Sequence, residues 1–199
     1  MAMAAEAKTE PIATHHVLVE LAELGELHED VVALDADLAV STQSIKFGKR
    51  FPERFFNVGA AEANMMSMAC GLAATGKVPY CSTFAIFAAG RAYDQIRLGI
   101  AHNELKIRVG ASHGGVSLGE DGASHQMIED IALMRAMPRM QVICPADYNQ
   151  AYRGHSSRTS APSRCTCGSG ARQRRSSTRT SPRLSAAGSR CCATARTSR

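Results

Sequence analysis

The chain of 199 residues is long enough for one domain with a sizeable hydrophobic core, whereas two full domains would have little room. The whole chain carries a net charge of +5, but its charges are unevenly distributed. Ten of the 23 Lys and Arg residues lie after residue 153, and all 18 Asp and Glu residues lie before it. Residues 1–153 therefore carry a net charge of −5. This acidic body argues against a protein that binds nucleic acid or a membrane surface, and no segment reaches the roughly 18 apolar residues that a membrane span requires.

The chain begins with a segment, residues 1–13, that contains charged residues and no continuous apolar run. We therefore expect a flexible N-terminal arm rather than a secretory signal, and a cytoplasmic protein. Along residues 14–153, segments of helical periodicity alternate with short strand-like runs. The expected helices are residues 14–28, 61–75, 87–100 and 126–137. The expected strands are residues 31–34, 55–58, 78–84, 106–112 and 141–144.

This alternation predicts an α/β domain over residues 14–153, with a parallel sheet covered by helices on both faces. Ligands of such sheets bind beyond the carboxyl ends of the strands. That rule selects Asp37, residues 59–62, Phe84 and His113 as candidate site positions. The sequence contains neither a G-x-G-x-x-G fingerprint nor a P-loop, which disfavours a dinucleotide or nucleotide-triphosphate site.

Three short segments of the chain stand out as motifs. Residues 119–126, Gly-Glu-Asp-Gly-Ala-Ser-His-Gln, resemble the substrate loop of transketolases. Residues 57–65 resemble the segment with the glutamate that activates the cofactor, and residues 82–87 resemble the strand end that stacks on the cofactor's pyrimidine. The resemblance runs from about residue 17 to residue 151. It implies the pyrimidine-binding domain of the thiamin diphosphate-binding fold.

Glu62 is the residue to which the resemblance assigns cofactor binding and catalysis. In thiamin enzymes a carboxylic acid at N1′ of the aminopyrimidine favours the imino form, which removes the thiazolium C2 proton. Such a carboxyl has to hold a proton near neutral pH, which favours a helix start among small apolar residues such as Ala61, Ala63 and Met65. For a lone glutamate, stabilisation of the helix dipole would be the better explanation.

Phe84 and Phe87 follow the expected strand 78–84, and their spacing alone is typical of core residues. The resemblance implies that both bind the cofactor, because offset stacking on an aromatic face suits a flat pyrimidine ring. Many transketolases have a third aromatic residue three positions further on, where this chain has Gly90. We therefore expect one wall of the pocket to differ.

The resemblance also assigns sugar-binding residues. It implies that His113 and His125 donate to the ketose carbonyl and hydroxyl groups as catalytic residues, and that Asp121 accepts a hydrogen bond from a substrate hydroxyl. The same three residues could bind a metal, but one Asp-x3-His pair with a distant His is weak evidence, and no metal site is predicted. Asp37 falls at a cofactor-side carboxylate of the family and Ser41 at a hydroxyl that contacts phosphate, with a helix N-cap as the alternative for either.

The diphosphate half of a thiamin site has no counterpart in this sequence. Thiamin enzymes hold Mg²⁺ and the diphosphate with a Gly-Asp-Gly motif followed by a more distant Asn, and the sequence contains no such motif. The resemblance therefore implies the carboxyl-terminal section of a split transketolase. We expect a hetero-oligomer built on a dimer, in which a separate N-terminal subunit binds the diphosphate and holds most of the Mg²⁺ contacts.

The implied reaction is the transfer of a two-carbon ketol unit between sugar phosphates, as in the pentose phosphate pathway, and this chain alone is expected to be inactive. A second interpretation is another thiamin-dependent ketol or acyl transferase subunit, such as a deoxyxylulose phosphate synthase or a pyruvate dehydrogenase β chain. Glu120 and Gln126, which flank the Asp121-to-His125 segment, favour transketolase. A third interpretation is a catalytically inactive, truncated interaction module.

Residues 154–199 have a different composition from the rest of the chain. They contain Leu184 as the only large aliphatic residue and no Phe, Tyr, Trp, Val, Ile or Met. Such a segment cannot bury enough apolar surface to fold, so we expect a disordered Arg/Ser-rich tail. An RNA-binding tail or a metal site at its cysteines is the alternative.

The genetic code favours a different origin for this tail. When the third base of each codon is read with the first two bases of the next, residues 164–171 permit V-Y-V-R-L-G-R, and residues 190–198 permit V-L-R-D-G-T-D-V. Both strings resemble transketolase sequence downstream of this domain, where a last strand and the start of a third domain follow. We therefore predict a frameshift, from one lost nucleotide near the codons for Arg153 and Gly154.

Overall fold

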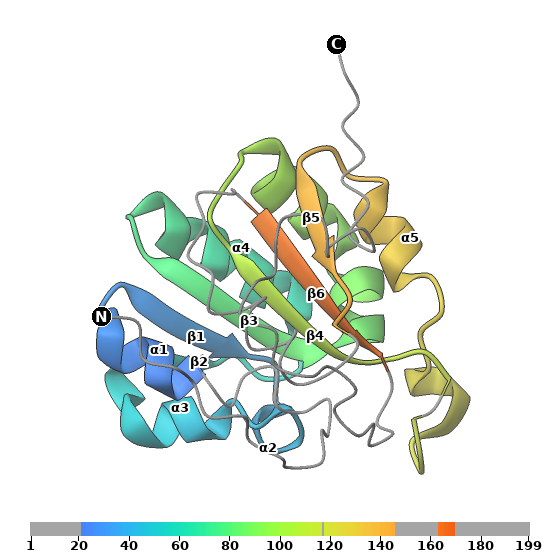
Figure 1. The fold of residues 1–199 in the computed structure, drawn as a ribbon, viewed down its shortest axis with the longest axis horizontal. Helices are drawn as coiled ribbons and strands as arrows, with labels where there is room; N and C mark the ends of the chain where they lie inside the picture. The colour runs from blue at the N-terminus through green and yellow to red at the C-terminus, as the bar shows by residue number, and fades with distance from the viewer. Residues whose placement is uncertain (1–20, 117, 146–162, 170–199) are drawn as a thin grey trace, which may run out of the picture.

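The computed structural model describes residues 21–116, 118–145 and 163–169. They form one six-stranded sheet in the order β2-β1-β3-β4-β6-β5, in which every neighbouring pair is parallel (Figure 1). The strands are β1 (Val31–Asp35), β2 (Phe55–Asn57), β3 (Val78–Phe84), β4 (Arg108–Gly114), β5 (Met140–Ile143) and β6 (Ser163–Ser169). The expected α/β class with a parallel sheet is confirmed.

Helices cover both faces of this sheet. The helical segments are α1 (Leu21–Leu27), α2 (Ala39–Thr42), α3 (Ile45–Arg50), η2 (Pro52–Arg54), α4 (Glu62–Ala74), η3 (Phe87–Arg91), η4 (Gln95–His102), η5 (Gly122–His125) and α5 (Asp130–Arg135). Because strand side chains alternate, Val32 and Leu34 enter a core with α4, η4 and α5, whereas Val31 and Ala33 enter a second core with α1 and α3. Within the described residues, no helix is both long and apolar enough to cross a membrane.

The helix expected at residues 87–100 is present as two π-helical segments, η3 and η4. The π-helix is rare and occurs frequently at functional sites. The helix expected at residues 61–75 is confirmed by α4, and Gly76 follows it with φ +91°, a conformation that favours glycine. Residues 14–20 of the first expected helix, and the arm at residues 1–13, lie outside the described residues.

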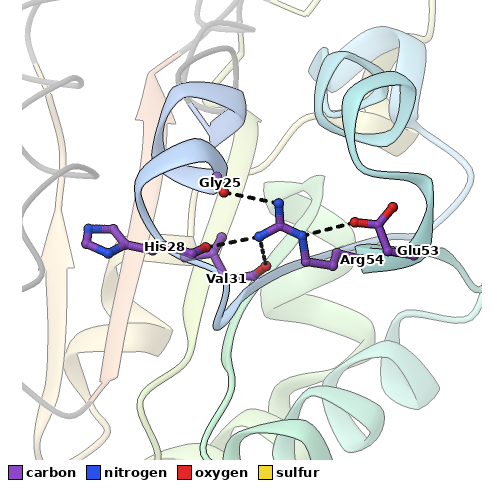
Figure 2. A network of polar contacts seen from close by, with 5 residues as sticks. All are labelled: Gly25, His28, Val31, Glu53 and Arg54. Atoms are coloured by element: carbon purple, nitrogen blue, oxygen red, sulfur yellow. Dashed lines mark hydrogen bonds and ion pairs between the residues drawn. The ribbon is translucent and has the colours of Figure 1, made fainter.

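Arg54 connects helix α1 to the start of strand β1 (Figure 2). Its guanidinium donates to the backbone carbonyls of Gly25 and His28 at 3.0 Å each, and to that of Val31 at 3.5 Å. The same group lies 4.0 Å from the ring centre of Phe51. Because a helix leaves its last carbonyls without intrahelical partners, Arg54 acts as the cap that ends α1 ahead of β1.

Strand β6 lies inside the segment that the sequence predicts to be disordered. It pairs in parallel with β4 and β5, with Arg164 opposite Arg108 and Ser163 opposite Met140. The structure thus gives a strand at residues 163–169 where the sequence predicts disorder, and the rest of residues 154–199 lies outside the described part of the chain. The physical reason is that a parallel ladder is made by backbone groups, so a segment without large apolar side chains can fill the position between two strands.

Candidate active site

The parallel register brings the candidate residues to one edge of the sheet. Asp35, the last residue of β1, lies opposite Asn57 of β2 and Ser82 of β3. Phe84, the last residue of β3, lies opposite Ser112 of β4. The loops that follow β1, β2, β3 and β4 therefore begin side by side, as expected for the ligand-binding edge of such a sheet.

Asp35 holds the loop after β1 in place. Its fully buried carboxylate accepts hydrogen bonds from the Leu38 amide at 2.7 Å, the Ser44 hydroxyl at 2.8 Å and the Thr42 hydroxyl at 3.2 Å. Burial raises the pKa of Asp35, and hydrogen bonds from Ser44, Leu38 and Thr42 partly oppose that shift. Sequence reasoning missed this residue, although three hydroxyl residues, Ser41, Thr42 and Ser44, follow within ten positions of the buried strand end.

Asp37 is exposed on this loop, and Ser41 is exposed on helix α2, which follows it. Asp37 has a left-handed backbone, with φ +63°, and its amide donates to the Asn57 side-chain oxygen at 3.2 Å. The Gly59 amide donates to the same oxygen at 3.0 Å, so Asn57 joins the loops after β1 and β2. The N-cap of α2 is Leu38 and makes no side-chain cap, which removes the N-cap alternative for both Asp37 and Ser41.

Glu62 is the first residue of α4, and only 3% of its surface is exposed. Met65 and Met66, on the next turn, are fully buried. The two carboxylate oxygens lie 3.3 and 3.5 Å from Nη1 of Arg91. A carboxylate that served only the helix dipole could stay in water, whereas this one is buried beside a single described cation.

The aromatic rings of Phe84 and Phe87 form a cluster with two imidazoles. Their planes are nearly parallel, at 12°, with ring centroids 6.1 Å apart. The His113 ring lies 4.2 Å from Phe84, and the His125 ring lies edge-on to Phe87 at 5.1 Å. The structure thus brings together four of the predicted site residues, from the carboxyl-terminal ends of β3 and β4 and from the segments η3 and η5 that follow them.

Each imidazole is oriented by the serine that precedes it. The Ser112 hydroxyl lies 2.8 Å from Nδ1 of His113, and the Ser124 hydroxyl lies 2.9 Å from Nδ1 of His125. His113 also has a left-handed backbone, with φ +57°, a strained conformation that is found at ligand sites. Asp121 is exposed at the N-cap of η5, and its backbone carbonyl accepts a hydrogen bond from the Ser124 hydroxyl at 3.3 Å.

Arg91 is the residue that joins Glu62 to the ring cluster, and sequence reasoning missed it. Besides its ion pair with Glu62, its guanidinium lies 4.2 Å from the ring centre of Phe87. The available signal was spacing, because a residue four positions after Phe87 shares its helix face. Glu62, Arg91, Phe87, Phe84 and the two imidazoles are therefore contiguous.

This arrangement suits an aminopyrimidine. A buried carboxyl can exchange a proton with a ring nitrogen, and the neighbouring faces of Phe84 and Phe87 match the flat shape of such a ring. Among the described residues, no group of three or more His, Cys, Asp or Glu side chains has the arrangement of a metal site.

Comparison with known proteins decides the family. Residues 12–160 match the family described as transketolase, pyrimidine binding domain. The chain belongs to this family. A Methanocaldococcus jannaschii protein named as a transketolase C-terminal section is 57% identical over 128 residues, which are 64% of this chain and 40% of that protein. Human transketolase is 46% identical over 128 residues, which are 64% of this chain and 20% of the human protein.

A solved transketolase structure supports the same assignment. It is described as a split gene transketolase, inactive beta4 tetramer, and it matches with a TM-score of 0.73 and 42% identity over 84% of this chain and 54% of that one. The chain thus spans less than half the length of the two relatives above. The transketolase pyrimidine-binding domain that was expected from the three sequence motifs is confirmed.

Proposed function

We propose that this chain is one subunit of a transketolase that transfers a two-carbon ketol unit between sugar phosphates. The observation that carries the proposal is the contiguous set at the sheet edge, in which buried Glu62 reaches the Phe84 and Phe87 rings through Arg91. Family membership supports thiamin diphosphate as the cofactor. When bound, that cofactor supplies the carbanion that cleaves and forms the carbon–carbon bond of the sugars.

In this proposal, each residue has a distinct role. Glu62 holds the proton at N1′ of the pyrimidine, and its burial keeps water from exchanging it. Phe84 and Phe87 hold the ring by stacking. His113 and His125 donate hydrogen bonds to the sugar carbonyl and hydroxyls, Asp121 accepts from a hydroxyl, and Ser41 contacts the substrate phosphate. Asp37 lies on the cofactor side of the loop that Asp35 holds in place.

We also propose that a second polypeptide supplies the diphosphate and Mg²⁺ half of the site. This rests on similarity to proteins named as a C-terminal section and as a split-gene transketolase. Large apolar side chains that are exposed in this structure also border the proposed site. They are Val40 after β1, and Val116 and Ile128 after β4. Such residues suit an interface with the partner.

The test of the function is co-expression with a diphosphate-binding transketolase subunit, followed by an assay of ketol transfer between xylulose 5-phosphate and ribose 5-phosphate. We expect transfer by the mixture and none by either chain alone. Activity with pyruvate as the acyl donor, and none with ketose phosphates, would favour the alternative thiamin-dependent transferases. A complex that forms but catalyses neither reaction would favour an inactive interaction module.

We propose, further, that the sequence after Arg153 is read out of frame. In the shifted register, residues 164–171 permit V-Y-V-R-L-G-R, and this stretch coincides with strand β6 (Ser163–Ser169). A β-branched and aromatic string suits a strand between β4 and β5 far better than Arg-Cys-Thr-Cys. Resequencing the gene tests this. A restored nucleotide near the codon for Arg153 is expected, and third bases that forbid both strings would refute the frameshift.

A further inference from the structure

Arg91 makes two contacts that bear on the proposed pyrimidine site. Its Nη1 lies 3.3 and 3.5 Å from the carboxylate oxygens of Glu62, whose side chain is only 3% exposed. Its guanidinium carbon also lies 4.2 Å from the ring centre of Phe87. One planar, positively charged group therefore contacts both the buried carboxylate of Glu62 and the aromatic face of Phe87.

An aminopyrimidine requires the same two surfaces. The guanidinium is planar, donates N–H groups to carboxylates and stacks on aromatic rings, so it has the shape and the donors of a small heteroaromatic ring. A pyrimidine whose N1′ bonds Glu62 and whose face lies on Phe87 cannot fit while Arg91 holds these contacts. We propose that Arg91 occupies the pyrimidine position of the free subunit and is displaced when the cofactor binds. This inference rests on the proposed function.

Its position allows Arg91 to leave. It is the last residue of η3, and 56% of its side chain is exposed, so the guanidinium can turn into water without opening the core. The preceding Gly90 is exposed, and nothing lies within 4 Å of the position of a Cβ atom there, so the backbone beside Arg91 is uncrowded. Departure of the guanidinium frees both carboxylate oxygens of Glu62 for a hydrogen bond with N1′. Arg91 is thus a positioning residue that links cofactor entry to the choice of partner of the Glu62 carboxylate.

The test measures affinity rather than turnover. The probe is 4-amino-5-hydroxymethyl-2-methylpyrimidine, the ring portion of thiamin, titrated into the 199-residue chain by NMR. The variants are Arg91→Ala, Arg91→Lys, Glu62→Gln and, as a matched control, Arg97→Ala, which removes an exposed arginine of the next helix η4. The same variants are then titrated with thiamin diphosphate and Mg²⁺ in complex with the diphosphate-binding subunit.

We expect Arg91→Ala to bind the probe about tenfold more tightly than the unmodified chain, because no guanidinium has to be displaced. Arg91→Lys keeps the charge but loses the planar stacking group, so its affinity should lie between the two, and it serves as the measured variant if Arg91→Ala does not fold. Arg97→Ala should bind as the unmodified chain does.

The inference is overturned if the Arg91 variants bind the probe and the cofactor no more tightly than the unmodified chain. If Glu62→Gln still weakens binding in that case, only the displacement of Arg91 is wrong. The proposed function itself fails if Glu62→Gln has no effect and no variant in the complex binds thiamin diphosphate.

Discussion

The ring centroids of Phe84 and His113 lie 4.2 Å apart, because β3 and β4 are neighbouring parallel strands that end side by side. This pairing places Phe84, the last residue of β3, against the imidazole of His113. The substrate-loop motif, residues 119–126, follows His113 in the chain. The pyrimidine contacts and the sugar contacts of the proposed site therefore share one wall. The predictions below separate the roles of the residues on this wall from those that only hold the fold.

Replacement of Glu62 by Gln tests the proton role directly. In the complex with the diphosphate-binding subunit, we expect turnover to fall by about 10²-fold or more, because an amide cannot exchange the N1′ proton. The melting temperature should change little, since an amide of the same size remains in the buried position. The matched control is Glu23→Gln, an exposed position on α1, which should leave turnover unchanged. Near-normal turnover of Glu62→Gln at saturating cofactor would assign Glu62 to the helix dipole.

Replacement of Phe87 by Leu tests the stacking role. We expect the dissociation constant for thiamin diphosphate in the complex to rise about threefold to tenfold, because an aromatic pair contributes about 0.5–1.5 kcal/mol beyond its buried area. Phe87 is half-buried, so its loss should affect stability less than that of Phe84, which is buried. Phe55→Leu changes a phenylalanine that packs against the opposite core and should not alter affinity. Equal effects at both positions would remove the stacking assignment.

Arg54 is expected to contribute to stability alone. Replacement by Ala removes three hydrogen bonds to backbone carbonyls and the contact with Phe51, so we expect the free energy of unfolding to fall by about 2–3 kcal/mol. Chemical denaturation measures this change. The control is Arg50→Ala, which breaks an exposed ion pair with Glu26 and should cost about 0.5 kcal/mol or less. Equal costs would show that Arg54 does not cap α1.

Asp35 gives a pH-dependent prediction. Burial raises its pKa above the ordinary 3.8, so as the pH rises the unfolded chain loses this proton before the folded chain does. The contribution of Asp35 to the free energy of unfolding is therefore greatest below about pH 4, and it decreases as the pH rises through the pKa of the folded state. Relative to Asp35→Asn, the unmodified chain should lose stability as the pH rises above about 4. The same substitution at exposed Asp94 should not change the profile. A constant difference between the unmodified chain and Asp35→Asn would contradict the shift.

Much of this fold follows from local sequence patterns. The apolar run that ends at Phe84 gives strand β3 its observed bounds, and the Ala- and Met-rich segment before Gly76 gives α4. Helices α2 and α3 were not predicted, because each is too short to display a helical period. Their position depends instead on the buried carboxylate of Asp35, which bonds side chains several residues later in the chain.

The site could be predicted only where a motif carried it. Glu62, Phe84, Phe87, His113 and His125 were selected from segments that resemble the family, and the structure brings all five into one contiguous group through Arg91. Arg91 was missed because its role depends on a carboxylate 29 positions earlier, on a different helix. Strand β6 was missed because the composition of residues 163–169 does not indicate that their backbone pairs with both β4 and β5.

The central claim is that this chain provides the pyrimidine half of a thiamin diphosphate site and that another chain provides the rest. Calorimetric titration of thiamin diphosphate with Mg²⁺ tests it most directly, first with the chain alone and then with an equimolar mixture of the chain and the diphosphate-binding subunit. We predict no tight binding by the chain alone and saturable, Mg²⁺-dependent binding by the mixture. Submicromolar binding by the isolated chain, or none by the mixture, would contradict the claim.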